Sequence, residues 1–423
     1  MFGTKYIPSY KQFLTTMKQN NPNPQKNNSK KNNSKKKVEE EEEEKPIQII
    51  PLEDRWNYVI NYHHSHSEIM DDELEKRYQL LINGRDNQTK MEGDSSAKNI
   101  IFYHRKAGLG NTITALADVF LLSLLSNRRF YGIIVFYCLS CLVYKWRSIF
   151  NYLQLPYNNV SLSEESIIFY SLSFLVWKDD PEKIISTDKG DCGLDLVGII
   201  NGTVTNKNII IRTSCRIDQF FVHSPVVRKW LKDNGIISDM RAHEIDIYHR
   251  IMQFLFVDVV QPRDEIIQAV QQYKNSVNWT DYSVLGIHLR TGLLEGNVGW
   301  GRFMEERDLE YFMIQAKRHT KKLKRIYPDR EVKWFVLADN EKVKYDIQKE
   351  AGDSFITTNC TIAHSKNQNA DGIFCSLVEN FLLSDCNYLI LTFRSTFGYL
   401  AKHRTDVGQV NVQPGSWKKL QPL

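Results

Sequence analysis

The sequence lacks three motifs that mark common nucleotide-using enzymes. Its glycine turn, "GLGN" at 108–111, has Ile113 where a complete G-x-G-x-x-G motif needs its third glycine. No Gly-Lys-Ser or Gly-Lys-Thr sequence follows a glycine loop, and no Asp-x-Asp triplet is present. These absences disfavour a nicotinamide-dependent enzyme and a P-loop kinase, and they give no acidic motif for a catalytic metal.

A long hydrophobic run is also absent. The most apolar stretch, "FYGIIVFYCLSCLVY" at 130–144, has 15 residues, whereas a membrane-spanning helix needs about 20. We expect a buried strand and its continuation here, with a membrane-embedded protein as the alternative. No signal peptide or N-terminal membrane anchor is visible in the sequence.

Cysteine gives little guidance. The seven cysteines are an odd number at irregular spacings, and the Cys138–Cys141 pair has no second C-x-x-C pair at a zinc-like distance. Its apolar flanks favour packing over metal or redox chemistry. Cysteine usage therefore does not fix the compartment.

The composition indicates a mostly globular chain with a low-complexity start. Of 423 residues, 42% are hydrophobic and 12% aromatic, which suffices for two domains. The net charge of +5 comes from scattered basic residues, so we expect no nucleic-acid partner. Residues 1–50 are rich in Asn and Lys and contain an unbroken run from Glu39 to Glu44, which predicts a disordered tail. Residues 51–97 follow as a helical lead-in, with 52–82 expected to be helical.

The rest of the chain alternates strands and helices. At 99–103 we expect a strand, then a tight turn at Gly108 and Gly110, a cap at Asn111 or Thr112, and a helix to Leu125. The same order returns with strands at 284–289, 333–340 and 388–392 and with helices at 305–326 and 373–386. The sequence therefore predicts an α/β protein with one unit at 98–275 and another at 276–423.

Three loops at strand ends could bind an anion. They are the "GLGN" turn, the pair His288 and Arg290, and the turn from Arg394 to Gly398. An arginine leaving a buried strand suits a diphosphate, although a structural ion pair with a carboxylate is the alternative. Ser395 or Thr396 could be an ordinary N-cap that binds nothing, or part of an anion site at a helix N-terminus. Together, the three loops favour a nucleotide diphosphate between two domains.

The motifs resemble those of a known family. "GLGNTITALADVFLLSLLSNRRF", "GIHLRTG" and "LVENFLLSDCNYLILTFRSTFGYLAKHR" resemble the plant-type xyloglucan α-1,2-fucosyltransferases, and "EIDIYHRIMQFLFVDV" is similar to a helical segment of these enzymes. The resemblance covers about residues 98–410. It implies a GT-B fold of two Rossmann-like domains that face each other across a cleft. The first domain would bind the acceptor and the second would bind GDP-fucose.

The resemblance also implies roles for individual residues. Transfer would invert the anomeric carbon and need no metal, and Arg290 would hold the pyrophosphate. From charge alone, Arg290 would then be the electrostatic catalyst, and Glu295, five residues further along the chain, is a candidate base. Glu379 would contact guanine, and Asp339 would lie near the nucleotide. The implied donor-binding set is completed by Gly108, Gly110, Asn111, His288, Arg290, Ser395, Thr396, Phe397 and Gly398.

Several points stay open at the level of sequence. A non-catalytic α/β protein that binds a nucleotide sugar or a glycan is the alternative to a fucosyltransferase. The partner would be a glycan or glycoprotein acceptor whose identity the sequence does not reveal. The resemblance implies the Golgi membrane or lumen, with the cytoplasm as the alternative. The oligomeric state is not predicted.

Overall fold

The computed structural model describes most of the chain from residue 52 onward. The described residues are 52–91, 98–103, 109–133, 153–154, 184–186, 196–204, 208–212, 218–292, 303–358, 360, 370–416 and 418. Gly108, Glu295, the Cys138–Cys141 pair, the predicted tail and most of the apolar stretch at 130–144 lie outside these residues.

The C-terminal unit is built on a parallel sheet of five strands. Their order is β11-β10-β7-β8-β9, and all neighbouring strands run parallel. The strands are β7 (Tyr282–Leu289), β8 (Glu331–Ala338), β9 (Phe355–Ile356), β10 (Tyr388–Thr392) and β11 (Gln409–Val412). The predicted strands at 284–289, 333–340 and 388–392 are confirmed.

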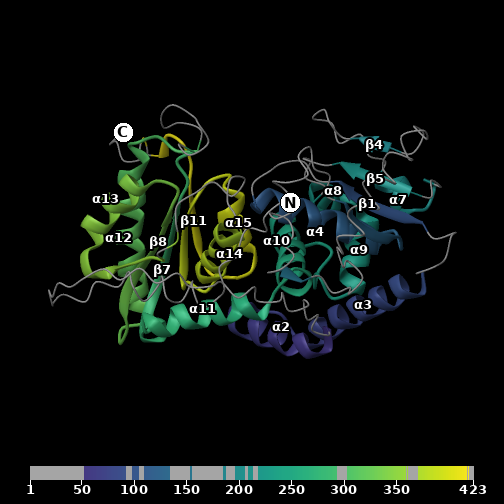
Figure 1. The fold of residues 1–423 in the computed structure, drawn as a ribbon, viewed down its shortest axis with the longest axis horizontal. Coiled ribbons are helices and arrows are strands. Elements are labelled where there is room, and N and C mark those ends of the chain that lie inside the picture. Colours follow the sequence, from purple (N-terminus) through teal and green to yellow (C-terminus); the bar gives the residue numbers. More distant parts are fainter. Residues whose placement is uncertain are drawn as a thin grey trace, which may run out of the picture.

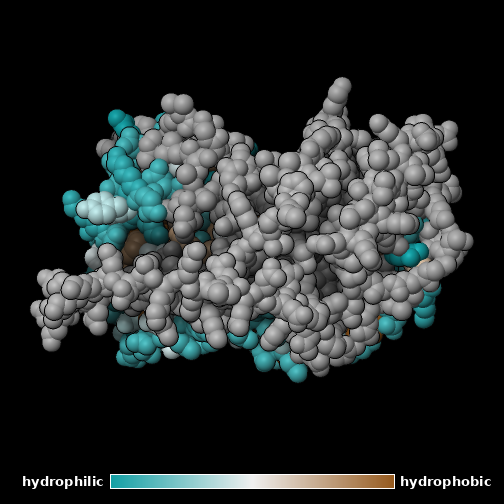
Figure 2. Space-filling view, in the orientation of Figure 1, coloured by the Kyte–Doolittle hydropathy of each residue, from teal (hydrophilic) through white to brown (hydrophobic). Residues whose placement is uncertain are grey.

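Helices cover both faces of this sheet (Figure 1). The helices α12 (Asp308–Ile326) and α13 (Glu341–Ala351) lie on one face, whereas α14 (Ala370–Ser384) and α15 (Thr396–His403) lie on the face turned toward the other unit. Strand β7 shows the alternation that produces this arrangement, because Leu285 and Ile287 pack with α12 while Val284 packs with α14. The outer surface over α12 and α13 is hydrophilic, as the basic residues of α12 predict (Figure 2).

The N-terminal unit contains a second parallel sheet. Its order is β2-β1-β5-β4, from β1 (Asn99–Tyr103), β2 (Arg129–Ile133), β4 (Ile184–Ser186) and β5 (Asn208–Arg212). The associated helices are α4 (Leu109–Leu125), α7 (Leu196–Ile200), α8 (Asp218–His223) and α9 (Pro225–Asp233). The predicted α/β class is confirmed by these two parallel sheets.

Two details differ from the sequence-based predictions. Helix α4 begins at Leu109, so Gly110 and Asn111 belong to its first turn and the predicted cap at Asn111 or Thr112 is wrong. The helical region at 52–82 is two helices, α2 (Leu52–His66) and α3 (Asp71–Lys90), separated by a short break.

The segment between the two sheets is mostly helical. It contains α10 (Glu244–Gln253), a π-helical turn η3 (Phe254–Val259), strand β6 (Gln261–Pro262), α11 (Asp264–Ser276) and the turn η4 (Trp279–Asp281), and β6 pairs with β3 (Leu153–Gln154). A continuous cluster of buried apolar side chains runs from α4 through η3 to α14 and α15. The two units are therefore packed through one hydrophobic core.

None of the described helices is both long and apolar enough to cross a bilayer.

Candidate functional site

Four polar residues follow the carboxyl ends of neighbouring parallel strands. Arg290 follows β7, Asp339 follows β8, Thr358 lies two residues past β9, and Ser395 lies three residues past β10. Because these strands run parallel, all four ends meet at one edge of the sheet, where α/β proteins bind their ligands. Of these four residues, Arg290, Asp339 and Ser395 were predicted from the sequence as site residues, whereas Thr358 was not.

Arg290 is fixed at this edge by its neighbours. Its backbone N–H donates to Oγ1 of Thr392 at 2.8 Å, and its Nε lies 3.4 Å from Oδ2 of Asp339. The guanidinium carbon lies 5.3 Å from the ring centre of Phe303. The ion pair with a carboxylate, which was the alternative interpretation of Arg290, is therefore present. It involves Nε, one of the five N–H donors of a guanidinium group.

Asp339 supports the turn that carries Arg290. Its Oδ1 accepts hydrogen bonds from the backbone N–H and the hydroxyl of Thr291 at 2.7 and 2.8 Å. Its Oδ2 accepts from the N–H of Gly292 at 2.9 Å. Both carboxylate oxygens are thus engaged by residues 290–292. This geometry makes Asp339 a residue that positions Arg290, while a direct contact with nucleotide stays a prediction.

His288 is a buried, neutral ring on the sheet face that meets α15. Its ring stacks on Phe397 with centres 5.1 Å apart and planes 25° apart. Its Nδ1 makes no hydrogen bond to the described residues, and a Cβ atom on Gly398 would lie 3.3 Å from it. Burial, and then the charge of Arg290, lower the pKa of His288 to about 3. The structure thus brings together His288, Phe397 and Gly398, and it keeps the imidazole uncharged at neutral pH.

The N-terminus of α15 is not capped by a side chain. Ser395 occupies the N-cap position and is 4% exposed, but its hydroxyl accepts no hydrogen bond from the helix. The first intrahelical bond runs from the N–H of Tyr399 to the carbonyl of Ser395 at 3.0 Å, so the N–H groups of 396–398 have no acceptor within the helix. The interpretation of Ser395 as an ordinary side-chain cap is wrong. An anion site at these N–H groups stays a prediction.

The first turn of α4 packs against the start of α15. A Cβ atom on Gly110 would stand 2.7 Å from Oγ1 and 2.8 Å from the backbone carbonyl carbon of Thr396. Only glycine allows this approach. The structure therefore brings together Gly110 and Thr396, which belong to helices of the two different units, whereas the side chain of Asn111 is exposed.

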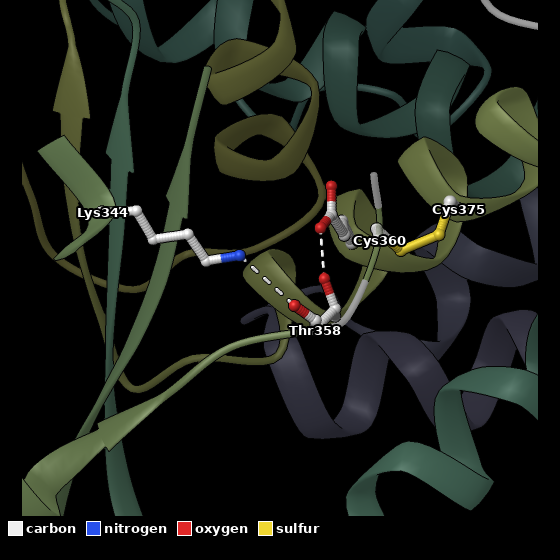
Figure 3. The surroundings of a disulfide bond; sticks show 5 residues. Lys344, Thr358, Cys360 and Cys375 are labelled. Carbon is white, nitrogen blue, oxygen red and sulfur yellow. Dashed lines mark hydrogen bonds between the residues drawn. A yellow bond between two sulfur atoms is a disulfide. The ribbon is translucent and has the colours of Figure 1, made fainter. Parts of the chain in front are cut away.

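Glu379 lies on α14 and is held by Thr358. The Thr358 hydroxyl donates to Oε1 of Glu379, and the Thr358 carbonyl accepts from Nζ of Lys344 at 3.3 Å (Figure 3). Burial raises the pKa of Glu379 to about 7, against the opposing effects of Thr358 and Lys344. Glu379 is therefore a carboxyl group whose charge changes near neutral pH.

Asn380, the next residue, joins α14 to α15. Its Nδ2 donates to the carbonyl of Phe397 at 2.7 Å, and its Oδ1 accepts from Arg404. Arg404 is 1% exposed, and its guanidinium lies 4.0 Å over the ring of Phe381. Burial lowers the pKa of Arg404 to about 10. Sequence reasoning missed both residues, although both lie inside the quoted C-terminal motif.

A disulfide between Cys360 and Cys375 lies beside Glu379 and was also missed. The seven cysteines have no spacing that singles out this pair, so only the tertiary structure reveals it. The described residues contain no group of three His, Cys, Asp or Glu side chains arranged to hold a metal ion.

Comparisons with known proteins agree with this architecture. Residues 242–405 match the family model of nodulation protein Z (NodZ). A mutant of Arabidopsis thaliana FUT1 in complex with GDP is similar in structure, with 15% identity, a TM-score of 0.51, and coverage of 86% of this chain and 80% of that chain. A fucosyltransferase NodZ from Bradyrhizobium has 14% identity and a TM-score of 0.41, covering 72% of this chain and 92% of that one.

A comparison with curated protein sequences finds no match. The likeness to the FUT1 structure shows the fold, and it confirms the predicted GT-B architecture. The match over 242–405 includes Arg290, Asp339, Glu379 and the turn at Ser395. The predicted resemblance is confirmed by the family match over 242–405 and by the likeness in fold to the FUT1 structure.

Proposed function

We propose that this protein is a glycosyltransferase that moves fucose from GDP-fucose to a hydroxyl group of a glycan, with inversion and without a metal. The main observation in support is that Arg290 and the uncapped N-terminus of α15 lie at the same edge of the sheet. The family match supports the enzyme class. The similar FUT1 structure, which is a complex with GDP, supports a guanine nucleotide as the donor's leaving group.

The leaving group explains why these two features belong together. When the sugar departs, negative charge develops on the β-phosphate oxygens of GDP. Arg290 would bind two of these oxygens through its planar fork, and the N–H groups at 396–398 would donate to the same phosphate. Both sets of donors are fixed before the reaction, which is the condition for strong electrostatic stabilisation. This charge compensation is our reason for proposing that no divalent metal is needed.

The remaining residues would orient the donor. Glu379 can accept hydrogen bonds from guanine N1–H and the 2-amino group, a pair that uracil lacks. His288 and Phe397 form a stacked wall beside the phosphate site, and Gly110 lets the first unit approach it. Asp339 would keep the Arg290 turn in place.

Proton removal from the acceptor needs a separate group. His288 is too weak a base for this step, since its pKa is about 3. Glu295, which lies outside the described residues, stays our candidate base.

The acceptor domain is proposed to be 98–275 and the donor domain 276–423.

We also propose that the protein works in an oxidising compartment such as the Golgi lumen. Structural disulfides persist in secretory compartments and are rare in the cytosol. The Cys360–Cys375 bond supports this placement.

The proposed function is tested with purified protein and nucleotide sugars. GDP should raise the melting temperature and UDP should not, and labelled GDP-fucose should be hydrolysed slowly and transferred to a glycan acceptor. Activity should survive EDTA. Equal thermal shifts with GDP and UDP would refute the donor, and tight GDP binding with no turnover on any acceptor would indicate a binding protein instead.

A further inference from the structure

The Cys360–Cys375 disulfide fastens the segment after β9 to the helix that carries Glu379. Cys375 and Glu379 are four residues apart on α14, so their side chains lie on the same face, one turn apart. Cys360 is two residues past Thr358, whose hydroxyl donates to Glu379. Figure 3 shows the disulfide and the Thr358 bond side by side. One covalent bond and one hydrogen bond thus connect the same two segments.

Thr358 is held from other directions as well. It is 1% exposed, and its carbonyl accepts from Lys344 of α13 at 3.3 Å. The neighbouring hydroxyl of Thr357 donates to the carbonyl of Val336 in β8 at 2.7 Å. The Thr358 hydroxyl therefore has a fixed position relative to the sheet edge.

We propose that Thr358, locked in place by the Cys360–Cys375 disulfide, is a positioning residue that presets the Glu379 carboxylate for a guanine base. This inference rests on the proposed function, because it assigns a structural cause to the choice of GDP. A carboxylate has about four acceptor positions. Thr358 occupies one on Oε1, which leaves Oε2 and a second position on Oε1 for two parallel N–H donors.

Presetting matters because Glu379 would otherwise sample several side-chain conformations. Fixing it before the ligand arrives removes an ordering cost from binding. The hydrogen bond from Thr358 also favours the ionised carboxyl group and so opposes the rise in pKa that burial causes. Thr358 thus supports both the orientation and the charge that guanine recognition requires.

The test compares two substitutions of Thr358 with one of a threonine on another helix, Thr320 of α12. Thr358→Val removes the hydroxyl and keeps the shape, and it should weaken GDP binding by about 10-fold or more, the usual effect of a lost hydrogen bond to a charged group. Thr358→Ser keeps the hydroxyl and should restore most of the affinity. Thr320→Val is the control: it removes the hydroxyl that accepts from the Trp334 indole N–H at 2.8 Å, makes no contact with Thr358 or Glu379, and should leave the GDP-to-UDP affinity ratio unchanged.

A pH profile separates positioning from a general structural role. Without the Thr358 bond, the pKa of Glu379 rises further, so the pH at which GDP affinity is half lost should move upward in Thr358→Val. Calorimetric titration of GDP across pH reads this shift. A structural defect alone would lower affinity at every pH without moving the midpoint.

The disulfide is tested on the full chain. Dithiothreitol reduces the S–S bond to two thiols and is itself oxidised to a cyclic disulfide. Reduction of the wild type, or the Cys360→Ser/Cys375→Ser double substitution, should weaken GDP binding, and dithiothreitol should not affect the double variant further. If Thr358→Val and the double variant keep the wild-type GDP affinity and the GDP-to-UDP ratio, the positioning role is wrong while the donor assignment stands. If the wild type does not bind GDP, the proposed function itself fails.

Discussion

Gly110 of α4 and Thr396 of α15 lie so close that a Cβ atom on Gly110 would stand 2.7 Å from Oγ1 of Thr396. The contact joins the two units at the helix N-terminus that we assign to the phosphates. It also explains why position 110 is a glycine, because any larger residue there would push the start of α15 away. Steric fit between the units therefore bears directly on the proposed donor site.

Gly110→Ala should displace α15 and damage both stability and GDP binding. Overpacking of this kind typically costs about 1–3 kcal/mol. Thr396→Ala should not rescue it, since the backbone carbonyl carbon of Thr396 would still lie 2.8 Å away. Denaturant unfolding and GDP titration measure both effects. Gly352→Ala is the control: its φ of +55° strains the backbone, but the space around it is open, so GDP affinity should not change.

Much of this site could be predicted from sequence because its signals are local. A short apolar run followed by Ser, Thr and Gly predicts the strand at 388–392 and the turn after it, and the structure has both at these positions. Likewise, Arg290 follows a strand whose apolar residues alternate between two faces. Such features depend on neighbours in the chain.

The missed features depend on contacts between distant segments. Thr358 lies 21 residues from Glu379, and Asn380 lies 24 from Arg404, so neither bond has a periodic signal in the sequence. The start of α4 was placed too late for the same reason, since its first turn includes a glycine whose role is to admit Thr396. Tertiary packing outweighs local propensity at these positions.

The charge of Glu379 should make the ligand-free protein less stable as pH rises. Its pKa is about 7 in the folded state, above the ordinary value of 4.5, so the folded state holds this proton more tightly than the unfolded state. The tightly held proton therefore contributes its full share of the free energy of unfolding below pH 4.5, and this contribution is lost as pH rises through 7. Glu379→Gln should remove the loss, making the variant more stable than the wild type at about pH 8 but not at about pH 4. Thermal melts at both pH values measure it, and parallel pH curves for the two proteins would contradict the assignment.

A charged cluster around Asp406 should make the contact between the C-terminal unit and α10 sensitive to acid. Asp406 accepts from Nε2 of His249 at 2.6 Å, from Arg250 at 2.9 Å and from the N–H of Glu68 at 3.0 Å. The His249 bond and Arg250 hold the pKa of Asp406 well below its usual range despite burial, and burial lowers the pKa of His249. As pH falls, Asp406 gains a proton and loses its ion pairs, and His249 takes up a proton more readily in the unfolded chain than in the folded protein. Both changes lower the free energy of unfolding in acid.

Asp406→Asn tests this cluster without touching the proposed donor site. We expect a loss of about 1–2 kcal/mol in the free energy of unfolding at neutral pH, toward the lower end of the cost of leaving hydrogen-bond donors without their charged partner, because these donors are only partly buried. The loss should shrink in acid, where the wild type is weakened as well. GDP affinity of the folded variant should stay at the wild-type value. Urea unfolding at two pH values measures this loss of stability, and GDP titration is the control. A loss that is the same at both pH values would contradict the role of the Asp406 charge.

Arg290 should be the main electrostatic catalyst, and its geometry should matter as well as its charge. Arg290→Lys keeps the positive charge but loses the planar fork that can bind two phosphate oxygens. We expect the transfer rate to fall on the order of 100-fold or more, the scale seen when one preorganised donor is removed. Ser395→Ala should have a smaller effect, because the N–H groups at 396–398 remain. Steady-state kinetics with GDP-fucose measure both.

The ion pair between Arg290 and Asp339 offers a second explanation for any effect of Arg290→Lys. If the arginine served mainly to hold the turn at 290–292, the variant would lose stability while its folded fraction kept the wild-type GDP affinity. Asp339→Asn supplies the comparison, since it weakens the ion pair and the support of the turn but keeps the guanidinium group itself. A catalytic Arg290 predicts a much larger rate loss in Arg290→Lys than in Asp339→Asn. Equal losses would make Arg290 a structural residue and would refute its assignment to the departing phosphate.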